Sequence, residues 1–333
     1  MSRRLSRRFS FSVVAVGLTL LLAACGSSGE GDDESAGGGT DLGEVRLGLV
    51  CGGVTPLIPQ VAMAAKTFPE GLSVKSTCFD GGSEMVQALI GGSVDVVIGS
   101  IEYPLSLRAQ DLDLKAYAVL ENRMPYVLVA PPDSTVDSID DLEGEKVGIT
   151  SPGSLSDTEL KKAAADAGVA YDSMQVLGVG AGTTAIAALQ QGQVAAGMVL
   201  QPTLADLLDK GYTTVWSPDF SFLSITALAK PDWASDHEAT MKGFLEGLST
   251  AYDKSEADAG FAVDAMSDSD FAVSDDVLAD AVSFTLDMVP PGLTVEEKDY
   301  QSTTDVLVDL GLYKESDILP FDEALDFGLL PSK

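Results

Sequence analysis

The chain has 333 residues and a formal net charge of −31, because 51 Asp and Glu stand against 20 Lys and Arg. Nucleic acid and anionic lipid surfaces would repel such a chain, so we exclude both as partners. His237 is the single histidine, and the sequence has neither a Ser/His/Asp arrangement nor a cluster of His and Cys. Most hydrolases and metalloenzymes need one of these, so we expect no catalytic residue, no metal site and no cofactor.

The first 24 residues have the order of a secretory signal peptide. Arg3, Arg4, Arg7 and Arg8 precede an apolar stretch, residues 9–24, that ends on small residues. The stretch is shorter than the roughly 20 apolar residues that cross ~30 Å of hydrocarbon. We therefore expect a signal peptide over residues 1–24 and not a permanent membrane span.

The four residues Leu22-Ala23-Ala24-Cys25 resemble the lipobox of bacterial lipoproteins. The resemblance implies that Cys25 is lipidated and becomes the first residue of the mature chain. Residues 25–43 are rich in Gly, Ser, Asp and Glu, and they cannot bury enough apolar surface to offset the loss of chain entropy. We expect a disordered tether with an r.m.s. reach of about 23 Å. The protein would then be extracytoplasmic and lipid-anchored to the cell membrane.

From residue 44 onward, short apolar β-runs alternate with helical segments. We predict strands over residues 45–50, 72–78, 94–98, 147–150, 174–179, 195–200 and 222–229, and helices over residues 56–68, 84–90, 157–167, 184–190 and 202–210, with mostly helical sequence after residue 229. This alternation indicates βαβ units and parallel sheets that are covered on both faces. The predicted class is α/β.

Cys51 and Cys78 remain as a pair once Cys25 is lipidated. Each cysteine closes or ends a predicted strand, and disulfides persist in the oxidising space outside the cell membrane. If the two strands are parallel neighbours, a disulfide joins them beside the loops that follow. The alternative is a pair of free buried thiols, and we favour the disulfide.

An internal repeat indicates two matching halves. Residues 82–94 align with residues 182–194 without a gap, and five of the thirteen positions are identical. Each copy contains a glycine turn, a helix of small residues and a second turn before a buried strand. Two copies are too few for a solenoid. Two similar α/β lobes are the simplest account, and a coincidence between common βαβ patterns is the alternative.

Several segments resemble the solute-binding proteins of ABC importers, in the branch that binds nitrate, sulfonates, taurine or thiamine pyrimidine precursors. The segments are GGSEMVQAL (81–89), VDVVIG (94–99), DLEGEKVG (141–148), SPGS (151–154) and ALQQGQV (188–194). The resemblance implies a two-lobed periplasmic-binding-protein type II fold, each lobe a mostly parallel sheet flanked by helices. Residues 44–129 and 224–333 would form lobe 1 and residues 130–223 lobe 2. Two crossover strands would lie near Val127–Ala130 and Phe222–Ala229.

The family fold places the ligand between the lobes, and ligands of open α/β sheets lie beyond the carboxyl ends of the strands. Taking each strand end in turn, the candidate ligand-binding residues are Thr55, Ser83, Ser100, Glu102, Tyr103, Asn122, Arg123, Ser151, Ser154, Ser156, Thr183 and Gln201. Ser83, Ser154 or Ser156, and Thr183 stand at predicted helix starts. We expect them to cap these helices, and an anionic ligand group held by the same N–H groups and hydroxyls is the alternative.

Charged and aromatic candidates indicate two ligand types. Arg123 is the one arginine that we expect near a crossover, where it pairs with an anionic ligand or with a surface carboxylate. Glu102 and Tyr103 suit an amine or aminopyrimidine, which a carboxylate and a ring grip by a charge-assisted bond and stacking. Gln201-Pro202 stands where the family often has glutamate-proline, which puts in doubt any ligand that depends on that glutamate.

These observations favour a monomeric substrate-binding lipoprotein rather than an enzyme. It would capture a small polar organic solute, a pyrimidine or thiamine-precursor-like heterocycle or an alkyl sulfonate, and deliver it to an ABC permease in the membrane. Two alternatives stay open. One is an enzyme on the same fold, since some relatives synthesise the pyrimidine precursor. The other is a lipid-anchored sensor of ligand occupancy.

Overall fold

The computed structural model describes residues 41–332 except residues 109 and 268–272. The predicted signal peptide, Cys25 and nearly all of the predicted tether lie outside the described residues. The first strand begins at Gly43, which is the last residue of the predicted tether.

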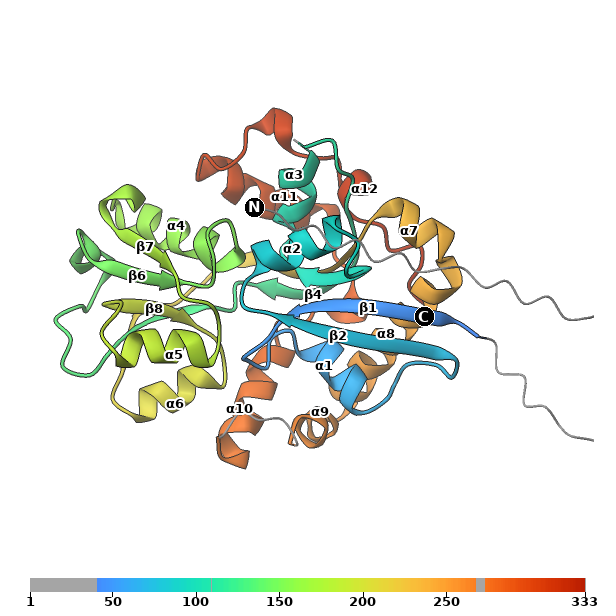
Figure 1. Cartoon of the computed structure of the whole chain (residues 1–333), viewed down its shortest axis with the longest axis horizontal. Helices are drawn as coiled ribbons and strands as arrows, with labels where there is room; N and C mark the ends of the chain where they lie inside the picture. The colour runs from blue at the N-terminus through green and yellow to red at the C-terminus, as the bar shows by residue number, and fades with distance from the viewer. Residues whose placement is uncertain (1–40, 109, 268–272, 333) are drawn as a thin grey trace, which may run out of the picture. The chain divides into compact units, whose positions relative to one another are not determined.

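The strands of the described residues form two five-stranded sheets, with the orders β2-β1-β3-β10-β4 and β7-β6-β8-β5-β9 (Figure 1). The first sheet contains β1 Gly43–Val50, β2 Leu72–Phe79, β3 Val96–Gly99, β4 Lys115–Arg123 and β10 Ser221–Ala229. The second contains β5 Val127–Ala130, β6 Lys146–Ile149, β7 Gln175–Gly178, β8 Ala196–Val199 and β9 Thr213–Trp216. In each sheet three strands run parallel, and a fourth strand, β10 in the first sheet and β5 in the second, runs antiparallel beside them. The predicted α/β class is confirmed.

The two sheets match strand for strand, and the internal repeat occupies equivalent places in them. Helix α2 (Gly82–Ile90) leads into β3, and helix α5 (Thr183–Gln190) leads into β8, each the middle strand of its sheet. Both helices end in a turn whose glycine has a positive φ, 73° at Gly92 and 65° at Gly192. In both turns the glycine N–H donates to the carbonyl of the leucine three residues earlier. The repeat is therefore a repeated structural unit.

The chain passes from the first sheet to the second between β4 and β5, and it returns between β9 and β10. The predicted crossover strands correspond to β5 and β10. The lobe boundaries that we predict, after residues 129 and 223, fall inside these two strands and remain a proposal. Strands β4 and β9 are absent from the sequence-based prediction. Both lie at sheet edges. Strand β9 is exposed or half-buried, so its apolar pattern is weak, whereas β4 is buried from Ala116 to Glu121.

Helices cover both faces of each sheet (Figure 1). Besides α2 and α5, the α-helices are α1 Leu57–Ala64, α3 Glu102–Arg108, α4 Leu155–Ala167, α6 Thr203–Asp209, α7 Pro231–Asp236, α8 Glu238–Ala257, α9 Ala259–Met266, α10 Asp275–Leu286, α11 Glu297–Asp309 and α12 Phe321–Ala324. In the first lobe α2 packs against β1 and β3, α11 packs against β10, and α8 packs on β1 with α1 beside it. In the second lobe α4 and α5 pack against β6. The predicted helix over residues 56–68 is shorter in the structure and ends at Ala64.

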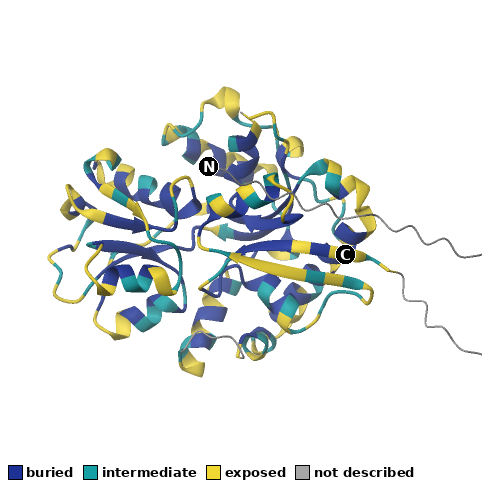
Figure 2. Cartoon of the chain, viewed as in Figure 1, coloured by how far each residue is buried: buried dark blue, intermediate teal, exposed yellow. Residues whose placement is uncertain are grey.

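Burial follows this layered arrangement (Figure 2). Strands β3, β5 and β8 are buried along their whole length, as expected for strands with helices on both faces. Strand β2 lies at an edge of its sheet and is mostly exposed. The apolar core therefore lies along the central strands, and the strand ends are free to carry the loops of a site.

The predicted neighbours β1 and β2 are parallel, and Leu49 pairs with Cys78 in their register. Cys51 follows the end of β1. In the structure Cys51 and Cys78 are joined by a disulfide, with their Cα atoms 5.4 Å apart. The bond ties the carboxyl ends of these two strands together.

Candidate ligand-binding cleft

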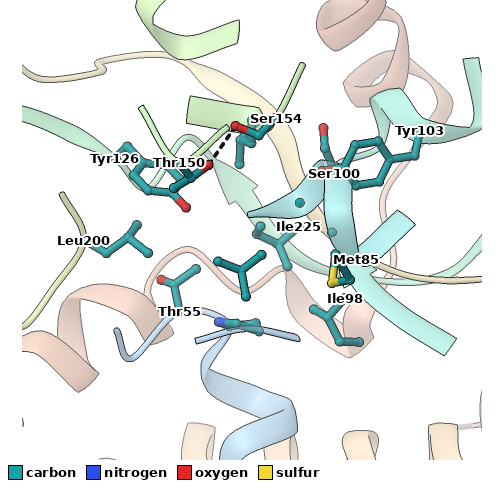
Figure 3. A pocket seen from close by; sticks show the side chains of 15 residues that line it. Thr55, Met85, Ile98, Ser100, Tyr103, Tyr126, Thr150, Ser154, Leu200 and Ile225 are labelled. Atoms are coloured by element: carbon teal, nitrogen blue, oxygen red, sulfur yellow. Dashed lines mark hydrogen bonds between the residues drawn. The ribbon is translucent and has the colours of Figure 1, made fainter. Parts of the chain in front are cut away.

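A cavity lies where the carboxyl ends of strands from both sheets meet (Figure 3). Both sheets belong to one unit of the chain, residues 39–333. The cavity is small in this arrangement of the lobes: its volume is about 30 Å³, against about 300–1,000 Å³ for typical small-molecule sites. Its polar lining consists of Thr55, Ser100, Tyr103, Tyr126, Thr150 and Ser154, and its main apolar lining of Val50, Met85, Ile98, Leu155, Leu200 and Ile225.

The polar groups of the cavity wall are hydroxyls, and no charged side chain is part of the described lining. Three hydroxyls from the end of β6 and the start of α4 contact one another. Thr150 Oγ1 lies 2.8 Å from Ser154 Oγ and 3.0 Å from Ser156 Oγ, and the two serine oxygens are 3.0 Å apart. Thr150 N–H also donates to Ser156 Oγ. This network holds the start of α4 against the end of β6.

The predicted helix caps are wrong. The residues before α2 and α5 are glycines, so Ser83 and Thr183 lie within the first turn of their helices and cap neither. Ser154 does occupy the N-cap position of α4, but its side chain makes no cap hydrogen bond there. These hydroxyls have other partners: Ser154 bonds Thr150, four residues earlier, and Ser83 Oγ donates to the distant Pro152 carbonyl at 2.7 Å.

The loops of the two sheets contact each other directly around the cavity. Val54 N–H donates to the Gln201 carbonyl at 2.9 Å, and Ser83 reaches Pro152 from the opposite lobe. A Cβ on Gly53 would lie 2.8 Å from the Gln201 carbonyl oxygen. Such backbone contacts require a glycine and form only when the lobes are together. The structure therefore shows a closed arrangement.

Glu102 is buried behind the cavity wall rather than in it. Its Oε1 accepts a hydrogen bond from Ser100 Oγ at 3.1 Å, and its Oε2 accepts one from Thr158 Oγ1 at 2.8 Å. Burial raises the pKa of the carboxyl to about 7, although both hydroxyl hydrogen bonds lower it. Thr158 belongs to α4 of the second lobe, so Glu102 connects the two lobes.

The predicted site residues separate into three groups. Those that line the cavity are Thr55, Ser100, Tyr103 and Ser154. Those that lie next to it, in the hydroxyl network or at the contacts between the loops, are Ser83, Glu102, Ser151, Ser156 and Gln201. Those that lie elsewhere are Asn122, Arg123 and Thr183.

Arg123 and Asn122 lie against the C-terminal part of the chain. The Arg123 guanidinium donates to the Asp287 carbonyl at 2.7 Å, and Asn122 N–H donates to the Met288 carbonyl at 2.8 Å. Arg123 is exposed. Its partner in the structure is a backbone carbonyl, which differs from both alternatives that the sequence suggests. Thr183 is exposed at the start of α5.

Sequence reasoning missed four residues at this site. Tyr126 and Thr150 line the cavity, and Glu121 and Glu159 are fully buried close to it. Glu159 Oε2 accepts a hydrogen bond from Tyr126 N–H at 3.1 Å. Burial raises the pKa of both carboxyls well above the usual value. A single acid at the end of an apolar run, as in Ala118-Val119-Leu120-Glu121, is the signal that could have found Glu121.

Within the described ranges, no three His, Cys, Asp or Glu side chains are grouped so that they could hold a metal ion. Among the helices described here, none combines the length and apolar character needed to cross a membrane.

A family model described as "NMT1/THI5 like" matches residues 69–258, which is more than half of the chain. The chain belongs to the NMT1/THI5-like family. This membership confirms the family resemblance seen in the sequence. No curated protein matches the chain significantly.

Solved structures share the fold of this NMT1/THI5-like protein. The alkanesulfonate-binding protein SsuA from Xanthomonas axonopodis pv. citri, bound to MOPS, has a TM-score of 0.69 at 20% identity, over 85% of this chain and 98% of its own. The periplasmic nitrate-binding protein NrtA from Synechocystis PCC 6803 has a TM-score of 0.67 at 13% identity, over 86% of each chain. A ligand-binding component of an ABC-type import system from Staphylococcus aureus has a TM-score of 0.68 at 16% identity, over 86% and 97%. The predicted two-lobed fold is confirmed.

Proposed function

We propose that this protein is an extracytoplasmic substrate-binding lipoprotein that captures a small polar organic solute for an ABC importer. The observation that carries the proposal is the cavity between the two sheets, lined by hydroxyls and apolar side chains at the strand ends. Family membership and the shared fold of transport-associated binding proteins support this role.

The lining suits a small heterocycle or an alkyl sulfonate. Tyr103 and Tyr126 offer rings for stacking, and Thr55, Ser100, Thr150 and Ser154 offer hydroxyls for hydrogen bonds (Figure 3). A pyrimidine or thiamine-precursor-like ring fits this mixture. Two proteins that share the fold bind alkanesulfonate and nitrate, so an alkyl sulfonate is the second ligand type that we propose.

Capture would occur by closure of the lobes around the ligand. The contacts of Ser83 with Pro152 and of Thr158 with Glu102 join the two lobes only when they are together. A ligand that binds the closed state more tightly shifts the population toward it. The closed lobes would present a distinct surface to the permease, and release would follow when they open.

Ligand-induced thermal stabilisation of the mature protein tests the proposal. The panel contains pyrimidines, alkyl sulfonates, taurine, nitrate and amino acids. We expect one class to raise the unfolding midpoint, because a ligand that binds only the native state stabilises it by about 2.7 kcal/mol at 100 times its Kd. If no class raises the midpoint, capture of a small polar solute is refuted.

A further inference from the structure

Loops of the two lobes approach each other closely beside the cavity, and glycines make the approach possible. A Cβ on Gly52 would lie 2.7 Å from the Gly182 Cα, and a Cβ on Gly53 would lie 2.8 Å from the Gln201 carbonyl oxygen. Carbon atoms in ordinary contact are about 3.5–4.0 Å apart. A side chain at Gly52 or Gly53 would therefore force these loops apart.

Two hydrogen bonds join the same lobes at different loops. Val54 N–H, after β1, donates to the Gln201 carbonyl, after β8, at 2.9 Å. Ser83 Oγ, in the first turn of α2, donates to the Pro152 carbonyl, after β6, at 2.7 Å. The two bonds share no residue, so a substitution can weaken one of them without touching the other.

This approach of the lobes leaves a cavity of about 30 Å³. A single buried water needs roughly 10–15 Å³ of such volume, so the cavity has room for about two waters. A pyrimidine ring and an alkyl sulfonate are each larger than that. The loops must therefore be farther apart in the ligand-bound protein than they are in this arrangement.

We propose that these contacts form an autoinhibitory latch, a tightly closed state in which Gly52, Gly53 and Ser83 hold the second lobe and exclude the ligand. The inference rests on the proposed function. Capture by closure stops short of the latched state, because the bound ligand keeps these loops apart. The apparent Kd equals the intrinsic Kd divided by the fraction of protein that is competent to bind. The latch therefore lowers the affinity, and weakening the latch raises it.

Hydrogen exchange of the Val54 amide tests the latch in the ligand-free mature protein. The amide is protected only while its hydrogen bond to Gln201 exists, so its exchange reports opening of the latch. Ser83→Ala should speed this exchange, although Ser83 lies in a different loop. The matched control is Ser173→Ala, which removes a hydroxyl-to-carbonyl bond of 2.6 Å within the second lobe and should change nothing. Equal exchange in the wild type and Ser83→Ala refutes the latch.

Ligand addition separates the latch from ordinary closure. The probes are 4-aminopyrimidine, methanesulfonate, taurine and nitrate. A probe that binds should speed exchange at Val54, because it selects a state in which the loops are apart. A bound probe that slows this exchange would overturn the latch and leave the proposed function standing. Failure of every probe to bind both the wild type and Ser83→Ala would instead overturn the proposed function, and the inhibition with it.

Titration calorimetry with the same probe measures the effect on affinity. Neither Ser83 nor Gly53 belongs to the described cavity lining. Ser83→Ala should bind the probe about threefold more tightly, the factor expected for one exposed hydrogen bond. Gly53→Ala should gain by a larger factor, because its Cβ pushes the Gln201 carbonyl away.

The control for the glycine variant is Gly178→Ala. Its Cβ would lie 3.4 Å or more from its neighbours, which belong to the second lobe, so the affinity should stay the same. Unchanged or weaker binding in both Ser83→Ala and Gly53→Ala would show that these contacts do not compete with the ligand, and the proposal would be wrong.

Discussion

The Glu102 carboxyl both titrates with a raised pKa and forms a hydrogen bond between the two lobes. Its carboxyl accepts hydrogen bonds from Ser100 in its own lobe and from Thr158 in the other. Burial still dominates and raises its pKa from 4.5 to about 7. The folded protein therefore holds a proton on Glu102 over a pH range in which the unfolded chain has released it.

This shift predicts that stability falls as the pH rises. Between about pH 4.5 and pH 7 the folded state binds more protons at Glu102 than the unfolded state, so the free energy of unfolding decreases with pH. The loss is at most roughly 3 kcal/mol, at 1.36 kcal/mol per pKa unit. Urea unfolding at pH 5 and pH 8 measures it.

The control is Glu102→Gln, which is neutral at both values of pH. The large negative net charge of the chain also makes the folded state more stable at acidic pH. This effect is common to both proteins, so the difference between wild type and variant isolates the contribution of Glu102. The variant should lose less stability than the wild type between pH 5 and pH 8. Equal losses would contradict the role of Glu102.

At the scale of elements, the loops between strands and helices carry the site, and the disulfide restrains two of them. Cys51 and Cys78 end β1 and β2, and the loops that follow these strands contain Thr55 and Ser83 or lead into them. Because β2 is an exposed edge strand, it has few apolar contacts to hold it in place. A covalent bond at its carboxyl end therefore limits how far the loops before α1 and α2 can separate.

Removing the disulfide should lower stability without changing the fold. The two cysteines are 27 residues apart, and closing a loop of that length contributes about 3–4 kcal/mol in the chain-entropy account. The double variant Cys51→Ala/Cys78→Ala should lose about that free energy of unfolding in urea. Mass spectrometry of the wild type should find the two cysteines two hydrogens short. Free thiols in the wild type would show that the pairing is wrong.

At the scale of the whole molecule, the proposed role combines a closing pair of lobes with a membrane tether. Lobe closure needs freedom of movement, and delivery to a permease needs proximity to the membrane. We propose that a lipid on Cys25 and the acidic segment between Cys25 and β1 provide both.

The anchor is tested by a single substitution. Cys25→Ala removes the acceptor of the lipid, so the protein should move from the membrane fraction to the soluble extracytoplasmic fraction. The wild type, fractionated in parallel, should stay with the membrane. Continued retention of Cys25→Ala at the membrane would rule out lipidation of this cysteine as the anchor.

The sequence by itself determined the α/β class, the two matching halves and most of the strands and helices, because apolar periodicity and glycine turns are local. It also placed Thr55, Ser100, Tyr103 and Ser154 at the cavity, since strand ends are readable from the pattern. It did not predict β4 or β9, which lie at sheet edges.

Only the tertiary structure decided which partners the polar side chains take. Ser83 has the local sequence of a helix cap, yet its hydroxyl donates to the Pro152 carbonyl, which the fold brings from the other lobe. Arg123 turns to the Asp287 carbonyl, 164 residues away in the chain. Glu121 pairs with Ile225, which lines the cavity, because β10 returns beside β4 after the entire second lobe. Such contacts depend on long-range topology, and no local pattern encodes them.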